Sequence, residues 1–320
     1  MIKKIEIRVT SGKWALEFSE REGLKRFVPV LQDSTILKEL SMSGFQFSNL
    51  GHLSNMVHLS TLNLKSNHLY NGKYSRSAIL ETRWQSKFFC SLLRRLAQNF
   101  SEGTDSMELQ ILQPISNLVQ LTALDLSDNK LRNIHALVTL TNLTRLDLYN
   151  NNISCIKPYD YYGETASTMV SSLEPLREHR KLTELNLGKN RIMDISPLSA
   201  LVKLTTLNLS RQLGFGLSKL TDITPLSQLT SITTLTLKKN RVVDITVLSN
   251  LIQLTDLDLS NNKIVSLDAL ENLNQLVTFD ASRNKIKYID ALQSLTQLRV
   301  RSKFENMKMK CSKLCHYNRL

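Results

Sequence analysis

Apolar residues recur along this chain at a fixed spacing, and a polar amide closes each group. Leu121, Leu124 and Leu126 are separated by three and two residues, and Asn129 follows three residues later. The group begins again 22 residues on, at Leu143. In this register nine groups cover most of residues 37–298, starting at Leu37, Leu59, Leu121, Leu143, Leu182, Leu204, Ile232, Leu254 and Leu276. A regular period of this length predicts a solenoid, in which each repeat contacts its neighbours.

The spacing inside one group predicts a short strand that ends in a turn. Leu124 and Leu126 lie two residues apart, so in a strand they share one face while Asp125 points to the other. The closing amide has donors and acceptors for backbone groups that the turn leaves unpaired. These amides are Asn67, Asn129, Asn151, Asn190, Asn240, Asn262 and Asn284.

Apolar residues after each amide recur at three-residue spacing, as Ile195, Leu198 and Leu201 do. This spacing favours short 3-10 or α-helical turns. We therefore predict an α/β solenoid, an arc with a parallel β-sheet on its concave side and short helices on its convex side. Its predicted parts are an N-terminal cap (1–36), nine repeats (37–298) and a basic capping helix or tail (299–320).

The repeat resembles that of leucine-rich-repeat proteins, whose pattern is matched by LTALDLSDNKL, LTELNLGKNRI and LTDLDLSNNKI. The 22-residue unit with the segments DISPL (194–198) and DITPL (222–226) is similar to two groups within that family. These are the regulatory subunit of type-1 protein phosphatase and the bacterial internalins. The resemblance implies a protein-binding solenoid and identifies no catalytic site.

Three places depart from the period, and each follows a predicted strand. Extra residues fall near 70–111, 157–174 and 211–217. Because they lie on the turn and the convex path, we expect them to leave the stack of strands intact. Loops of such length are typically functional or disordered.

The first insertion contains an apolar stripe at four-residue spacing, formed by Leu80, Trp84, Phe88, Leu92 and Leu96. This stripe predicts an amphipathic helix, and its other face is basic. Two interpretations are open. The helix packs on the convex side of the solenoid with its basic face in water, or it meets a membrane surface, an acidic partner or a calmodulin-like groove.

The C-terminal segment is basic and has lost the repeat pattern. At helical spacing it carries Val300, Phe304, Met307, Cys311 and Leu314, which predict a helix that covers the last repeat. The alternative is an arm that contacts a partner. This segment carries +6 and the stretch 73–100, which holds the predicted amphipathic helix, carries +5; together they make +11 of the net charge of +13, so the rest of the chain is nearly neutral.

Composition excludes several classes of protein. Leu accounts for 58 of 320 residues, while 10 Gly and 6 Pro are too few for a collagenous or low-complexity chain. The four cysteines do not form a disulfide framework, and the first residues do not resemble a secretory signal. We expect a cytoplasmic or nuclear monomer with no membrane span.

No arrangement of residues indicates catalysis, and we expect neither an enzyme, a cofactor nor a metal site. The six histidines are scattered without the spacing of a metalloprotease or hydrolase motif. Asp256 and Asp258 resemble a metal-binding pair, but the repeat itself places acidic residues at this spacing.

The candidate site is the solvent-facing side of the predicted sheet and the ends of its strands. Its residues are Asp125, Arg145, Asp147, Tyr149, Glu184, Lys189, Arg211, Lys238, Lys239, Asp256, Asp258, Asp280 and Arg283. Acidic residues lie within the strands and basic residues at their ends. An open groove of mixed charge favours a folded protein partner over a lipid, which needs apolar lining, or a nucleic acid, which needs one sign of charge.

The sequence thus predicts a non-catalytic scaffold or regulator that binds protein through its concave face. Phosphatase regulation is a narrower version, although Tyr149 is the one aromatic residue expected on that face. The alternative is an internalin-like adhesion or receptor-binding protein.

Overall fold

The computed structural model describes residues 5–10, 13–18, 37–44, 50–67, 69–75, 106–109, 111–154, 172–213 and 219–300. The chain forms two compact units. Unit 1 comprises Met1–Leu121 and Leu126–Leu140, and unit 2 comprises Thr122–Asp125 and Thr141–Leu320. The repeat pattern gave no sign of this division.

Unit 1 contains a hairpin followed by the first repeats. Strands β1 (Ile5–Thr10) and β2 (Lys13–Phe18) pair antiparallel, and β2 pairs in parallel with β3 (Leu37–Ser41). Strand β3 pairs in parallel with β4 (Thr61–Asn63). The region predicted as an N-terminal cap therefore places two strands beside the first repeat.

A second sheet in unit 1 uses both ends of the first predicted insertion. Strand β5 (Tyr70–Ser75) pairs antiparallel with β6 (Ser106–Leu109) and in parallel with β8 (Lys130–Leu131). The predicted amphipathic helix with its Leu80–Leu96 stripe lies outside the described residues. The 3-10 turns of unit 1 are η1 (Gly51–Leu53), η2 (Gln113–Asn117) and η3 (His135–Leu137).

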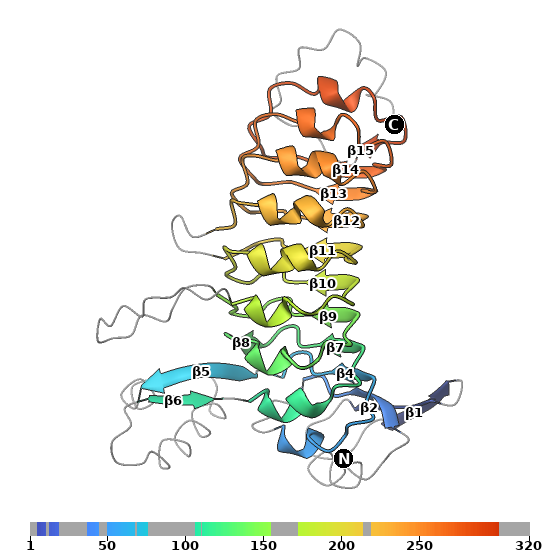
Figure 1. The fold of residues 1–320 in the computed structure, drawn as a ribbon, viewed down its shortest axis with the longest axis vertical. Coiled ribbons are helices and arrows are strands. Elements are labelled where there is room, and N and C mark those ends of the chain that lie inside the picture. Colours follow the sequence, from blue (N-terminus) through green and yellow to red (C-terminus); the bar gives the residue numbers. More distant parts are fainter. Residues whose placement is uncertain are drawn as a thin grey trace. The chain divides into compact units, whose positions relative to one another are not determined.

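Unit 2 is a stack of parallel strands (Figure 1). In spatial order they are β7 (Ala123–Asp125), β9 (Arg145–Asp147), β10 (Glu184–Asn186), β11 (Thr206–Asn208), β12 (Thr234–Thr236), β13 (Asp256–Asp258), β14 (Thr278–Asp280) and β15 (Arg299–Val300). The central leucines align across the pairings, as Leu146, Leu185 and Leu207 do. The repeat supplies one apolar residue per strand at the same place, a leucine in β7 and β9–β13, Phe279 in β14 and Val300 in β15, and this sets the register.

Short 3-10 turns lie on the opposite side of unit 2 from the strands (Figure 1). They are η4 (Glu174–Leu176), η5 (Ser196–Ala200), η6 (Thr224–Gln228), η7 (Thr246–Asn250), η8 (Asp268–Leu270) and η9 (Asp290–Leu292). Open parallel strands on one side and 3-10 turns on the other confirm the predicted repeat solenoid.

Aspartates form Asx turns that lead into three of these 3-10 turns. The Oδ1 atoms of Asp194, Asp222 and Asp244 accept the backbone N–H two residues on, at 2.8, 2.9 and 2.8 Å. Hydrogen bonds from the backbone N–H and then the hydroxyl of Thr246 hold the pKa of Asp244 below its ordinary value. The aspartate of the DISPL and DITPL segments therefore has a local structural role.

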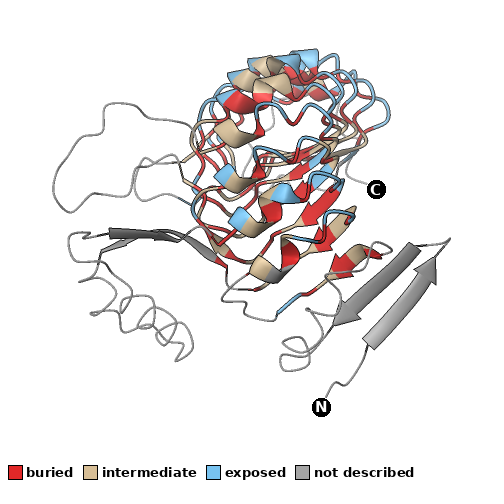
Figure 2. Cartoon of the chain, turned by 60° about the horizontal axis from the view of Figure 1, so that its bottom comes forward, coloured by how far each residue is buried: buried red, intermediate tan, exposed pale blue. Residues whose placement is uncertain are grey.

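The core of unit 2 fills the space between strands and turns (Figure 2). In one repeat, five apolar residues are each at most 1% exposed, namely Leu185, Leu187, Ile192, Ile195 and Leu198. Burying each such side chain contributes roughly 1.5–3 kcal/mol, so the leucine pattern supplies most of the driving force for stacking.

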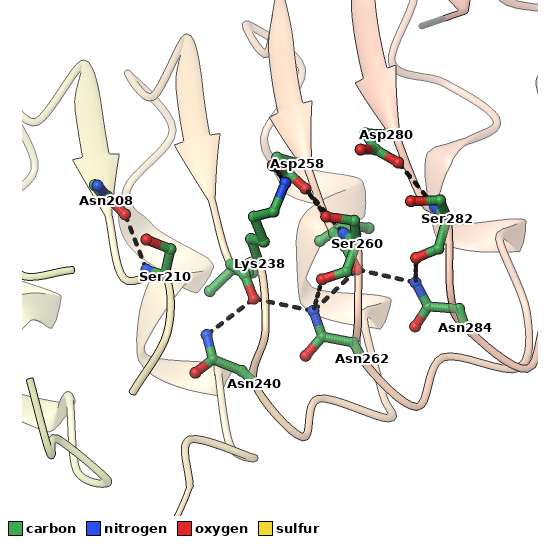
Figure 3. A network of polar contacts seen from close by, with 12 residues as sticks. Asn208, Ser210, Lys238, Asn240, Asp258, Ser260, Asn262, Asp280, Ser282 and Asn284 are labelled. Atoms are coloured by element: carbon green, nitrogen blue, oxygen red, sulfur yellow. Dashed lines mark hydrogen bonds and ion pairs between the residues drawn. The ribbon is translucent and has the colours of Figure 1, made fainter. Parts of the chain in front are cut away.

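The repeated amides link successive turns. Asn190 Nδ2 donates to the carbonyl of Leu187 in its own repeat, at 3.0 Å, and to that of Leu148 in the preceding repeat, at 2.9 Å. Its Oδ1 accepts the N–H of Ile153 at 3.1 Å. Asn240, Asn262 and Asn284 repeat this arrangement in the following turns (Figure 3). The predicted pairing role is confirmed, and each of these amides also joins two repeats.

Glutamine replaces asparagine in one turn. Gln212 Nε2 donates to the carbonyls of Leu187 and Leu209 at 2.9 and 3.2 Å, and its Oε1 accepts the N–H of Ile192 at 3.0 Å. The side chain is 1% exposed. Below, "ladder amide" means this residue and the equivalent asparagines.

The later departures leave the sheet of unit 2 continuous. Strand β9 pairs with β10 across the insertion at 157–174, and β11 pairs with β12 across the insertion at 211–217. Residues 155–171 and 214–218 lie outside the described residues. At the C-terminal end, Arg299 and Val300 pair with Thr278 and Phe279 as β15, so the first two residues of the predicted tail continue the sheet. The predicted capping helix falls beyond the described residues.

Candidate functional site

The side of the unit 2 sheet that faces away from the leucines is called the sheet face here. It consists of the first and third residues of β7 and β9–β14. Seven predicted site residues lie on it, namely Asp125, Arg145, Asp147, Glu184, Asp256, Asp258 and Asp280.

The other six predicted residues lie in the turns, two or three positions beyond a strand. They are Tyr149, Lys189, Arg211, Lys238, Lys239 and Arg283. All thirteen belong to unit 2, and none of them is buried. Their role in binding a partner stays a prediction.

Acidic residues at the strand ends shape the turns that follow. The Oδ1 atoms of Asp147, Asp258 and Asp280 accept the backbone N–H two residues later, at 2.8, 2.9 and 2.8 Å. Asn186 and Asn208 form the same bond in the intervening repeats, at 3.2 and 2.9 Å. These are Asx turns, in which the side chain imitates a backbone acceptor. The acids of the sheet face thus serve the fold as well as the surface.

A row of threonines precedes the strands and links the repeats. The hydroxyl of Thr144 donates to the carbonyl of Thr122 at 3.0 Å, 22 residues earlier. The hydroxyls of Thr183, Thr205, Thr233 and Thr255 each donate to the carbonyl of the preceding threonine in the row, at 3.0–3.2 Å. Val277 holds this position in the last of these repeats and has no hydroxyl to donate.

Charged groups of β13 and of the turn after β12 are joined to their neighbours (Figure 3). Lys238 Nζ lies 3.3 Å from Asp258 Oδ2, and the hydroxyl of Ser260 donates to Asp258 Oδ1 at 2.6 Å. Asp256 accepts the hydroxyls of Thr255 and Thr278. Both carboxylates of the pair that resembled a metal motif are thus hydrogen-bonded within the protein.

The region of β9 and β10 is organised around Tyr149. A Cβ added to Gly188 would lie 3.0 Å from the Cδ2 atom of Tyr149, so the glycine leaves room for the ring. The ammonium of Lys189 lies 5.6 Å from the ring centroid, within the range of a cation–π contact. The ring thus lies close to Gly188, with the cation of Lys189 beside it.

Charged side chains lie on β9 and β10, the strands that lead into the turns of Tyr149 and Gly188. Arg145 and Glu184 are register partners on adjacent strands, and both are exposed. Asp147 accepts the amide of Asn186 at 3.1 Å on its second oxygen. Arg145, Asp147, Tyr149, Glu184, Gly188 and Lys189 are called the Tyr149 patch below.

Some residues with a structural role were not singled out from the sequence. Gly188 interrupts a series of larger residues beside Tyr149, and the threonines stand directly before the strand positions in consecutive repeats. Gln212 occupies an asparagine position of the motif. The threonines recur at a fixed position of the repeat, and Gly188 and Gln212 interrupt a repeated position. Their roles could not be predicted because their partners lie 20 or more residues away in sequence, as Ile192 does from Gln212.

Other chemistry is sparse in the described part of the chain. Its residues contain no group of three or more His, Cys, Asp or Glu that could hold a metal ion. Among these residues, no helix has the length and apolar character needed to span a bilayer. All four cysteines lie outside the described residues. Away from the sheet face, the Arg177 guanidinium lowers the pKa of Glu174 through a hydrogen bond.

Comparison with known proteins agrees with this geometry. A family model that describes a pair of leucine-rich repeats matches three segments of the chain, residues 112–161, 180–227 and 252–294. The fold resembles an internalin, InlF, from Listeria monocytogenes, with a TM-score of 0.57 and 26% identity over 85% of this chain and 69% of that one. The chain thus contains leucine-rich repeats and folds as a leucine-rich-repeat solenoid. No curated protein sequence matches it at a significant level.

Two more distant structures show how differently this fold is used. The Arabidopsis receptor kinase HAESA, solved with a peptide hormone and a co-receptor, has a TM-score of 0.60 and 20% identity over 92% of this leucine-rich-repeat protein. The TLR13–ssRNA13 complex has a TM-score of 0.60 and 19% identity over 93% of it. This protein spans 42% and 37% of those two chains. At such identities the likeness shows the fold alone, so the surface chemistry must indicate the ligand.

Proposed function

We propose that this leucine-rich-repeat protein is a non-catalytic scaffold or regulator that binds a folded protein partner through the sheet face of unit 2. Leucine-rich-repeat folds are typically protein-binding or receptor-like, which supports the general class. The specific surface, the regulatory role and action as a monomer in the cytoplasm or nucleus belong to the proposal.

The Tyr149 patch carries this proposal. Tyr and Arg are the residues most enriched among interface hot spots, and a side chain that is already ordered loses less entropy on binding. Gly188 and Lys189 restrain Tyr149, and the exposed Arg145 lies on the strand that precedes it. A restrained aromatic ring with exposed charges beside it suits a protein surface.

The test is quantitative affinity capture from an extract of the source cells. The baits are the intact chain, the variant Arg145→Ala with Tyr149→Ala, and a control variant Lys203→Ala with Gln253→Ala. The control residues are exposed and precede strands β11 and β13. We expect a partner that the intact chain and the control retain and that the patch variant loses by at least about tenfold, as for a hot-spot pair.

Matched melting curves for the three baits must show that the variants are folded. Equal capture by all three would show that the Tyr149 patch is not the binding site.

A narrower version of the proposal is regulation of a type-1 protein phosphatase. Titration calorimetry of the intact chain with that phosphatase's catalytic subunit tests it directly. If no heat of binding is measured at micromolar concentrations of both proteins, regulation of type-1 protein phosphatase is excluded. The general proposal of a protein-binding scaffold is unaffected by that result.

The alternative is an internalin-like adhesion or receptor-binding role. The likeness to InlF over 85% of the chain favours it. Fractionation of the source cells, combined with labelling of surface proteins, distinguishes the two roles. Labelled protein at the cell surface would support adhesion, and protein confined to the soluble fraction would support the intracellular scaffold.

A further inference from the structure

The turns after β10–β14 carry basic residues directly before their ladder amides. These are Lys189, Arg211, Lys239 and Arg283, with Asn261 in the turn after β13. All five have a left-handed backbone with φ between 55° and 59°. The N–H groups of Lys189, Arg211 and Lys239 donate to the carbonyls of the next turn, at 2.7–2.8 Å. These cations are therefore stacked in register, about one strand spacing of 4.8 Å per repeat.

A second basic row directly follows the ladder amides. It consists of Arg191, Arg241, Lys263 and Lys285, with Leu213 in the turn after β11. The backbone N–H groups of these four cations donate to carbonyls of the preceding repeat, at 2.9–3.0 Å. This row is stacked in the same register as the first. The eight cations of the two rows are called the basic edge.

No acid accompanies the basic edge. Segments 188–193, 210–213, 238–243, 260–265 and 282–287 contain neither Asp nor Glu. Among the residues that the structure describes, none of the eight cations forms an ion pair. The neighbouring Asp258 is paired with Lys238. The other nearby acids, Asp194, Asp222, Asp244 and Asp280, each accept a backbone N–H two residues on. Stacked like charges repel one another, and an anionic ligand would relieve this repulsion. Each repeat that the ligand contacts would add a favourable electrostatic interaction.

Exposed apolar side chains lie beside these cations. Leu213 occupies one place in the second row. Val243 and Val265 each stand two residues after a cation of that row, Arg241 and Lys263. Their side chains are 48%, 53% and 44% exposed. The surface along this edge is therefore both cationic and apolar.

We propose that the basic edge binds an acidic, partly apolar extended segment of a protein partner. The segment's carboxylates would pair with the stacked cations, and its apolar side chains would cover Leu213, Val243 and Val265. Five repeats span roughly 20 Å, which about six extended residues cover. This inference rests on the proposed function, because it names the chemistry of the partner that unit 2 receives.

The described surface favours a protein over a polyphosphate or an anionic membrane. Phosphate groups gain nothing from exposed valine and leucine. Among the described residues, the aromatic ring in contact with an edge cation is Tyr149, beside Lys189 at the first of the five repeats, so bases could not stack along the whole edge. The adjoining sheet face carries Glu184, Asp256 and Asp280, which would repel an extended anionic surface. A peptide can place carboxylates on the edge and other groups toward these acids.

The test measures binding of labelled probes to the full chain by fluorescence anisotropy at low ionic strength. The probes, each about ten units long, are an alternating Glu-Val peptide, an alternating Glu-Ser peptide and oligothymidylate. We expect the Glu-Val peptide to bind about fivefold more tightly than the Glu-Ser peptide, because valine gains from contact with the apolar residues. It should also bind more tightly than oligothymidylate and than vesicles that contain phosphatidylserine.

Two double variants with equal charge change locate the binding. Lys239→Glu with Arg241→Glu alters the basic edge. Lys181→Glu with Lys203→Glu alters exposed cations that lie three residues before strands β10 and β11. We expect the first to weaken Glu-Val binding about tenfold or more and the second less than about twofold. Val243→Ser with Val265→Ser should reduce the affinity for Glu-Val to that for Glu-Ser. Melting curves verify that each variant is folded.

Three results would overturn the inference. One is equal weakening by the two charge variants, and another is equal affinity for the two peptides. The third is tighter binding of oligothymidylate or vesicles than of Glu-Val. The proposed function fails by a different observation, namely partner capture that survives Arg145→Ala with Tyr149→Ala, so the two failures are distinguishable.

Discussion

The sheet face and the basic edge of unit 2 both carry charge, but they use it differently. On the sheet face, Asp147, Asp258 and Asp280 each accept a backbone N–H in the turn that follows their strand. On the edge, eight cations are stacked through five repeats, and no ion pair involves them within the described structure. A charge in a repeat motif thus serves the fold at one position and stays available to a ligand a few residues later.

The ladder amides lie between the two rows of the edge, and substitution there should have the largest effect. Asn240→Ala removes donations to the carbonyls of Leu209 and Leu237 and leaves the N–H of Gln212 without its acceptor. We expect the free energy of unfolding to fall by about 3 kcal/mol, because buried backbone groups lose their partners. Urea denaturation measures this, with the exposed Asn250→Ala as control. Equal losses for the two variants would show that the ladder does not stabilise the stack.

Gly188→Ala should have the next largest effect on stability, and it should weaken partner binding as well. The new Cβ would meet Tyr149, Asn208 and Ser210 at 3.0 Å, so the ring has to move. We expect a loss of about 1–2 kcal/mol in stability, together with weaker partner capture. Adding Tyr149→Ala should restore part of the stability but none of the binding. If Gly188→Ala leaves both unchanged, Gly188 does not position the ring.

Substitutions at Asp258 distinguish the contribution of its turn hydrogen bond from that of its charge. Asp258→Asn keeps an oxygen for the N–H of Ser260 and loses the ion pair with Lys238, which is partly exposed. We expect a cost of about 0.5 kcal/mol for Asn and about 1 kcal/mol or more for Ala. Chemical denaturation of the two variants measures the difference. A larger loss for Asn than for Ala would mean that charge, and not the turn, matters here.

The smallest effect on stability is expected on the basic edge. Lys239→Gln with Arg241→Gln should change the unfolding free energy by no more than about 0.5 kcal/mol, since no ion pair is lost. A small gain at low salt should disappear at high salt, because salt already screens the repulsion that the substitution removes. Melting curves at two salt concentrations measure both effects. A marked loss of stability would show that the edge cations serve the fold as the sheet-face acids do.

Much of this architecture was predictable, because its signals are local and repeated. The spacing of Leu185 and Leu187 and the position of Asn190 gave the strand, the buried face and the turn. Their burial and hydrogen bonds confirm them. The short 3-10 turns followed from the three-residue spacing of Ile195, Leu198 and Leu201. These features repeat because every unit solves the same packing problem.

The candidate site was predictable in position but not in composition. Sequence alternation placed Asp147 and Tyr149 on the surface, but gave no sign that Asp147 would bond the N–H of Tyr149 and the amide of Asn186. It also placed Lys189 among the groove residues without its contact to the ring of Tyr149. Insertions separate these partners by up to 40 residues, and only the stacked register brings them together.

The sequence by itself determined the repeat, the identity of the buried residues and the rows in which charges are arranged. These depend on a residue's place within its own unit, where a strand alternates with a period of two and an amide closes the turn. Tertiary structure decided which of these charges are used. An acid is occupied when a backbone N–H or a lysine of the next turn reaches it, and a cation stays available when no acid lies above or below it. Such distances arise only when the repeats stack, because stacking sets residues from different units about 4.8 Å apart.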